Sequence, residues 1–164
     1  MATVARISIA PVKGLALVER EAVLLEESGV RDNRRFHVVD ADGRRYNQLR
    51  NGALVQIKPK VEGDRLVLRF PDGTVAEGEV ALGEEVTTDF YGRAVGGRAL
   101  DGPWSAALSD WAGRPLRLIQ SEPGAAIDRG GGHVSLVSRA SLAELGRHTG
   151  DNGPTDGRRF RRRS

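Results

Sequence analysis

The first half of the chain alternates short apolar stretches with turn-forming residues. This alternation predicts strands over residues 3–9, 36–39, 54–57, 66–70, 75–80 and 86–90, and a short loop over residues 11–14. Tight turns are expected at Asp42-Gly43, at Gly63-Asp64 and at Asp72-Gly73, because Asp and Gly tolerate the left-handed backbone that such turns need. Turns that recur about every 8–12 residues are typical of a small antiparallel β-barrel or sandwich.

The pattern changes after Phe90. Apolar residues at helical spacing predict a helix over residues 103–111, with Pro103 suited to its start and Gly113 to its end. Further strands are expected over residues 116–119 and 134–137, and Ser138 is placed to cap a helix that runs to His148. The fold class expected is therefore mainly β (α+β): a small antiparallel β-barrel with two short helices in the C-terminal half.

Composition narrows the class of protein. The chain has 164 residues and no cysteine, which excludes a disulfide framework, a thiolate metal site and a cysteine nucleophile. No apolar run approaches the ~18–20 residues that a membrane span needs. We therefore expect a cytoplasmic protein without a membrane partner.

Charge is unevenly distributed. The formal net charge is +3, but the last eight residues contain five arginines and no acid. Subtracting those five charges leaves −2 for the rest of the chain, so the basic pI belongs to the tail. An acidic body with only 5% aromatic residues disfavours nucleic-acid binding, because base-stacking platforms are scarce.

Anion recognition is the most coherent chemistry that the residues suggest. Lys13 follows the first strand, and Arg34 and Arg35 precede the apolar strand that starts at Phe36. Guanidinium groups hold phosphate by paired charged hydrogen bonds, and lysine adds a point charge. The alternative is that Lys13 is a solvated loop lysine and that Arg34 pairs with an acid nearby, Asp32 or Asp40. Because a surface ion pair contributes little to stability, we expect replacement of Lys13 or Arg34 by alanine to leave the melting temperature nearly unchanged while weakening the binding of phosphate or pterin phosphate.

The other constellations are weaker. His37, His133 and His148 are far apart in sequence, so each is interpreted as a structural histidine rather than a metal ligand. The glycines at 130–132 resemble a phosphate cradle only loosely, because no Lys-Ser/Thr pair follows them. We expect no catalytic residue and no metal ligand in this chain.

Several motifs, in order along nearly the whole chain, carry a resemblance to a known family. They are PVKG at 11–14, RRFHVVD at 34–40, YNQLR at 46–50, LSDWAGRPLRL at 108–118, VSLVSRASL at 134–142 and RFR at 159–161. Together they resemble the N-terminal β-barrel domain of MOSC proteins, which include the mitochondrial amidoxime reducing component and its bacterial relatives. The resemblance implies an N-terminal barrel domain over residues 1–120 and the beginning of a MOSC domain over residues 121–164.

The resemblance also implies functions. By this resemblance the chain is expected to bind the molybdenum cofactor (molybdopterin), molybdenum and pyridoxal phosphate, and to have an oxidoreductase-like role. By analogy Lys13, Gly14 and Arg34 would contact the pterin phosphate, with Gly132 lining the pocket and Arg161 reaching it from the MOSC side. Two departures stand out: the family's Gly-Asp-Arg is here Asp32-Asn33-Arg34, and the cysteine that ligates molybdenum is absent. The chain thus resembles a truncated member.

Three hypotheses about function follow. The chain could be a cofactor-binding module that works with a MOSC catalytic half or a redox partner. It could be a fragment of an active molybdenum-dependent reductase of N-hydroxylated compounds or of a sulfur carrier. It could also be a small barrel that binds nucleic acid through its arginine tail. The missing cysteine argues against the second for this chain alone, and the acidic body argues against the third.

Overall fold

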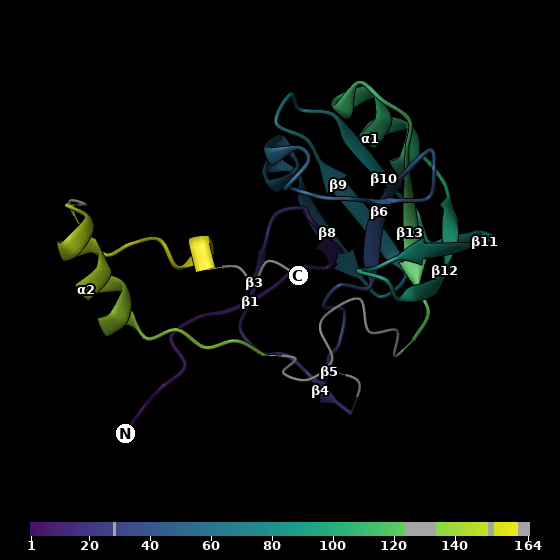
Figure 1. Ribbon diagram of the computed structural model, residues 1–164. Helices are drawn as coiled ribbons and strands as arrows, with labels where there is room; N and C mark the ends of the chain where they lie inside the picture. Colours follow the sequence, from purple (N-terminus) through teal and green to yellow (C-terminus); the bar gives the residue numbers. More distant parts are fainter. Residues whose placement is uncertain (28, 124–133, 151–152, 161–164) are drawn as a thin grey trace. The chain divides into compact units, whose positions relative to one another are not determined.

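The computed structural model describes residues 1–27, 29–123, 134–150 and 153–160 (Figure 1). The chain divides into two compact units, residues 1–127 and residues 128–164. Each unit is described by itself below. None of the helices in the described residues is long and apolar enough to span a membrane.

The largest sheet of the first unit has six strands. Its order is β11 (Ala81–Asp89), β12 (Ala94–Asp101), β13 (Leu116–Ser121), β6 (Phe36–Asp40) and β2 (Val12–Lys13), and β7 (Arg45–Tyr46) also pairs with β6. All of these pairings are antiparallel except that of β2 with β6, which is parallel. Parallel pairing puts Lys13 directly opposite His37.

Three smaller sheets complete the unit. One contains β8 (Lys58–Glu62), β9 (Arg65–Arg69) and β10 (Val75–Glu79), and the two others pair β1 (Ile7–Ile9) with β3 (Val18–Arg20) and β4 (Leu25–Glu26) with β5 (Gly29–Val30). Within the described residues the strands form several antiparallel sheets rather than one ring closed by hydrogen bonds. The β-rich, barrel-like fold and the two helices confirm the fold class expected from the sequence.

Side chains tie the separate sheets together. The Arg20 guanidinium on β3 donates to the Val61 carbonyl on β8 (3.3 Å). Arg35, just before β6, donates to the Gly63 carbonyl (2.9 Å) and to the Asp64 carboxylate (2.8 Å) in the β8–β9 turn. The Arg35 guanidinium therefore links the large sheet to the sheet of β8, β9 and β10.

Alternation along β6 buries both faces of the large sheet. Phe36 and Val38 face the main core, whereas Val39 packs with Ala99 and Ile119 in a second core. The main core also takes residues from other strands of the large sheet, from the small sheets, from the connecting segments and from α1 (Trp104–Ala112): Val12, Leu15, Tyr46, Leu54, Ile57, Val61, Leu66, Leu68, Phe70, Ala76, Leu100, Trp104, Leu108, Leu116 and Leu118. A strand that is buried on both faces has a nearly continuous apolar sequence, and this explains the apolar pattern that predicted a strand over residues 36–39.

The large sheet curves around the second core. A bridge between Arg44 and Asp89 brings the end of β11 to the hairpin that joins β6 and β7. Phe90 and Val95, at the two ends of the β11–β12 turn, are both buried and form a third, smaller cluster. The residues that face this side of β6 are therefore shielded from solvent.

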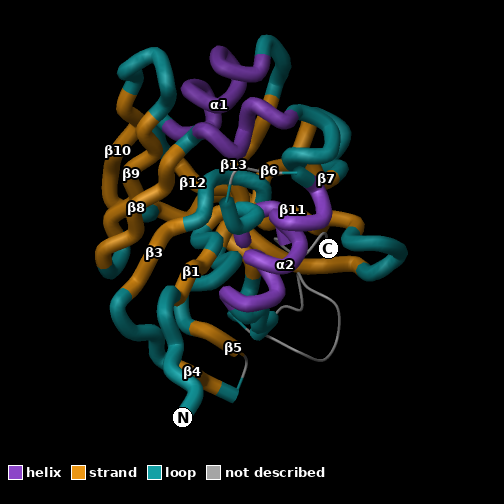
Figure 2. Tube along the Cα trace, turned by 90° about the vertical axis from the view of Figure 1, so that its left-hand side faces the viewer, coloured by secondary structure: helices purple, strands orange, loops and turns teal. Residues whose placement is uncertain are grey.

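Both expected helices are confirmed. Helix α1 starts after Pro103 and ends at Gly113, whose φ of +65° is the left-handed conformation that glycine favours at a helix end. It lies beside β13 and β10 (Figures 1 and 2). In the second unit, α2 (Arg139–Thr149) starts at Ser138, whose hydroxyl accepts from the Ser141 amide (2.9 Å). A short 3₁₀ turn, η2, spans Gly157–Phe160.

Several local predictions were wrong. The loop expected at residues 11–14 contains β2, and no strand forms over residues 134–137. Residues 54–57 lie largely in a 3₁₀ helix, η1 (Gly52–Gln56), because the Asn51 side chain caps it by accepting from the Ala53 amide. The longest of the strands that were not predicted are β8 and β12.

A candidate anion site beside a buried histidine

Lys13 is the predicted site residue that the fold constrains most. It is the last residue of β2, and its side chain is only 5% exposed. Its ammonium nitrogen lies 5.5 Å from the centre of the Phe90 ring, a cation–π arrangement. The alternative interpretation of Lys13 as a solvated loop lysine is therefore wrong. A buried charge needs compensation, so the surroundings of this ammonium decide what the site can do.

His37, opposite Lys13, is a satisfied core residue. Its Nδ1 lies 2.9 Å from the Ser121 hydroxyl on β13, and its Nε2 lies 3.0 Å from the Thr88 hydroxyl on β11. The ring meets Phe90 edge-on at 5.0 Å. Because a hydroxyl can donate or accept, both ring nitrogens are satisfied in either neutral tautomer. The interpretation of His37 as structural agrees with this geometry.

The pKa of His37 is lowered from 6.5 to about 4, first by burial and then by the positive charge of Lys13. The imidazole is therefore neutral near pH 7, and Lys13 carries the charge of this pair. A neutral histidine does not repel a second cation, so the surroundings can hold one more positive group.

Arg45 on β7 is that second positive group. Its guanidinium carbon lies 5.6 Å from the centre of the Phe90 ring and 3.7 Å from the centre of the Tyr91 ring. Its Nη1 is buried and has no hydrogen-bond partner among the described residues. Lys13 and Arg45 thus approach the same phenyl ring from two strands, and together they form a cationic cluster.

Gly14 is explained by packing. Its φ is +98°, and a Cβ atom there would come 3.3 Å from the Asn47 Cα atom. The absence of a side chain lets β2 approach the segment after β7. The Oε1 atom of Gln48, in this same segment, is buried without a hydrogen-bond partner in the described part of the chain. Two polar atoms with unmet hydrogen bonds, on Arg45 and Gln48, therefore border the Lys13–Gly14 segment.

Arg34 lies at the start of the parallel strand pair. Its amide donates to the Ala10 carbonyl (2.7 Å), and the Asn33 side chain accepts from the Ala10 amide (2.9 Å). Arg34 has a φ of +59° and Asp32 a φ of +61°. Asp32 stands where the resembled family has glycine, and it adopts a conformation that glycine would adopt, so the tight turn does not require glycine here.

Asp40 and Asp32, the acids considered for Arg34, both contact other arginines. Asp40 binds Arg50 (2.9 Å), and Asp32 lies 3.8 Å from Arg35. The expected convergence of Lys13 and Arg34 on one anion stays a prediction. Gly132 and Arg161, the other two predicted contacts, lie outside the described residues.

These features fit a known domain family. A family model described as the MOSC N-terminal beta barrel domain matches residues 1–113 of the chain. The chain belongs to this family. The match confirms the resemblance inferred from the motifs, while the predicted boundary at residue 120 stays a prediction.

Individual relatives of this MOSC protein are distant. None of the curated proteins matches the chain. Among solved structures, the chain is similar to the solution structure of a protein from Bordetella bronchiseptica that was a structural-genomics target. The two share 20% sequence identity with a TM-score of 0.46, and the alignment covers 67% of this chain and 95% of the other.

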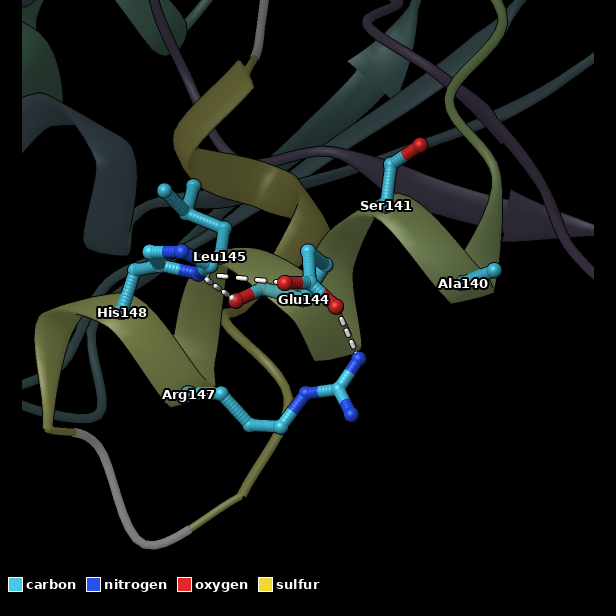
Figure 3. Close-up of a pocket in the computed structure, with 6 residues that line it drawn as sticks. All are labelled: Ala140, Ser141, Glu144, Leu145, Arg147 and His148. Atoms are coloured by element: carbon cyan, nitrogen blue, oxygen red, sulfur yellow. Dashed lines mark hydrogen bonds and ion pairs between the residues drawn. The ribbon is translucent and has the colours of Figure 1, made fainter.

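The second unit carries a shallow surface depression. It is lined only by residues of α2: Ala140, Ser141, Glu144, Leu145, Arg147 and His148 (Figure 3). Glu144 is paired with Arg147 and lies 3.3 Å from His148 Nδ1. The charged side chains of this depression pair with one another on one exposed helix. The depression therefore offers no binding groups that converge on a ligand. No group of three metal-ligating side chains occurs among the residues described.

Sequence reasoning missed half of the cationic cluster. Arg45, Phe90 and Tyr91 come from a short strand and a hairpin that lie far from Lys13 in the sequence. The one available signal was Tyr91-Gly92, because glycine at the second position suits the type I′ hairpin turn, in which both central residues take a positive φ. Nothing in the sequence indicated that this turn packs over β7.

Proposed function

We propose that this MOSC N-terminal domain binds the phosphate end of the molybdenum cofactor, with Lys13 and Arg34 as cationic contacts. The observation that supports this most is the buried Lys13 ammonium, held beside Phe90 by the parallel pairing of β2 with β6. A lysine kept out of water in this way is pre-organised for an anion and loses little side-chain entropy on binding.

The residues fit one end of the cofactor and not the other. Ammonium and guanidinium groups suit a phosphate monoester. The chain has no cysteine, so it cannot supply the soft thiolate that suits molybdenum. The bound cofactor would supply redox chemistry, and this chain's residues would bind and orient its anionic end. We therefore also propose that a MOSC catalytic half is the partner that completes the metal site.

The direct test is transfer of the cofactor. The purified chain is mixed with molybdenum cofactor released from a denatured molybdoenzyme, re-isolated by gel filtration, and assayed by fluorescence of the oxidised pterin. Wild type is expected to retain pterin, and Arg34→Ala and Lys13→Met to lose most of it. Met keeps the aliphatic length of the buried side chain while removing its charge.

Exposed cations provide matched controls. Lys60→Met and Arg31→Ala change residues that pair with Glu62 and Glu26 on the surface, and both variants should retain pterin like wild type. Equal retention by all five proteins, or no retention by wild type, would overturn the proposal. Thermal melting of each variant separates loss of binding from loss of folding.

A further inference from the structure

We infer that Arg45 is a phosphate-binding residue of this domain and that Tyr91 is the cover over it. The inference deepens the proposed function, and it rests on that function only in treating Lys13 as part of the same anion site. It is carried by three observations on β7 and on the β11–β12 turn.

The first observation is the unmet hydrogen-bonding capacity of Arg45. A buried guanidinium N–H without an acceptor is unfavourable, and Nη1 of Arg45 is in this position within the described residues. Stacking on the Tyr91 ring at 3.7 Å satisfies the face of the guanidinium but not its N–H groups, which lie in the guanidinium plane. An oxygen acceptor is what this group lacks.

The second observation is that an anion suits this position better than a neutral acceptor. Lys13 and Arg45 lie 5.5 Å and 5.6 Å from the centre of the same Phe90 ring, and His37 beside them is neutral. The Asp40 carboxylate next to β7 is already used, because it accepts from Arg50 and from the Arg44 amide. A phosphate carries a negative charge and several acceptor oxygens, which suit the Arg45 guanidinium with its unmet N–H group.

The third observation concerns Tyr91. It is 56% exposed and has a φ of +57°, at the tip of a two-residue turn in which the Phe90 and Arg93 backbones are hydrogen-bonded to each other. The type I′ geometry of this turn requires a positive φ, which is unfavourable for tyrosine and is tolerated by asparagine. The ring covers Arg45 from an exposed turn, so it can swing away without disturbing the core.

The experiment titrates inorganic phosphate into the protein and follows binding by calorimetry and by the Tyr91 ring signals in NMR. Arg45→Gln is expected to weaken binding by about tenfold or more, the size of one lost charged hydrogen bond. Arg44→Gln is the matched control, since Arg44 is the exposed neighbour on the same segment, and it should bind like wild type. Tyr91→Asn keeps a residue that tolerates positive φ, removes the cover, and should bind phosphate several times more tightly.

Each outcome separates this inference from the proposed function. If Arg45→Gln binds phosphate like wild type while Lys13→Met does not, water satisfies the N–H groups of Arg45. In that case the inference about Arg45 is overturned and the proposed function is not. If Arg45→Gln loses phosphate while Lys13→Met and Arg34→Ala retain it, the inference stands and the proposed contacts are wrong. If wild type binds no phosphate, the inference is overturned and the pterin assay alone decides the function. Tyr91→Asn binding more weakly than wild type would show that the ring positions Arg45 and does not cover it.

Discussion

Lys13 and His37 lie directly opposite each other on two parallel strands, and the charge of the first helps to keep the second neutral. Both side chains are buried, at 5% and 1% exposure. His37 also joins three strands, because β6 carries it while its hydrogen-bond partners lie on β11 and β13. The pair therefore links the stability of the sheet to pH and to the charge at the candidate anion site.

We expect stability to fall between pH 6.5 and about pH 4. The pKa of His37 is about 4 when folded and near 6.5 when unfolded, so the unfolded chain binds more protons in this window. The stability that His37 contributes is present above pH 6.5 and is lost as pH falls through the window, by about 3 kcal/mol in total.

Urea unfolding measured from pH 7.5 to pH 4 tests this linkage. His37→Gln is expected to be less stable than wild type at pH 7 but to show a flatter pH dependence. Parallel curves for wild type and His37→Gln would contradict the assigned pKa.

Removing the charge of Lys13 should raise the pKa of His37. Burial still disfavours the imidazolium, so the value is expected to rise above 4 and stay below 6.5. NMR titration of the His37 ring protons in Lys13→Met measures the shift directly, with Lys60→Met as the exposed control. An unchanged pKa would mean that the ammonium lies too far from the ring to act on it.

Replacing Gly14 by alanine should destabilise the domain by about 1–3 kcal/mol. The new methyl group would meet the backbone of Asn47, and φ at this position is +98°. Gly52→Ala is the matched control, because that glycine has no neighbouring atom within 4 Å and no positive φ. Equal melting temperatures for the two variants would show that β2 can shift away from Asn47.

Turn chemistry made much of the fold predictable. Gly43, Gly63 and Gly73 all have positive φ, and the last two lie in the turns that join β8 to β9 and β9 to β10. Prediction failed where local signals misled. Pro59 and the Gly96-Gly97 pair are unusual within strands, and here neighbouring strands and packing override that preference.

The candidate site was less predictable than the fold. Lys13 and Arg34 could be singled out because each lies next to a strand in a recognisable motif. The burial of Lys13 could not be predicted, because it depends on Phe90. Phe90 lies in the β11–β12 turn, about 80 residues further along the sequence. The expectation that replacing Lys13 leaves the melting temperature nearly unchanged assumed an exposed side chain; Lys13 is buried, and the expectation stays a prediction.

The two tryptophans should differ sharply in their contribution to stability. Trp104 is fully buried and its Nε1 donates to the Leu66 carbonyl (3.1 Å), whereas Nε1 of Trp111 has no hydrogen-bond partner among the described residues. Trp104→Phe leaves a buried carbonyl without its donor and a cavity beside it, at a cost of about 2–4 kcal/mol. Trp111→Phe removes an unsatisfied donor and keeps an aromatic ring against Phe70, so its cost should be below about 1 kcal/mol. Chemical unfolding of both variants, with far-UV circular dichroism as the probe, measures the difference. A larger loss for Trp111→Phe would mean that the indole nitrogen of Trp104 does not hold α1 to β9.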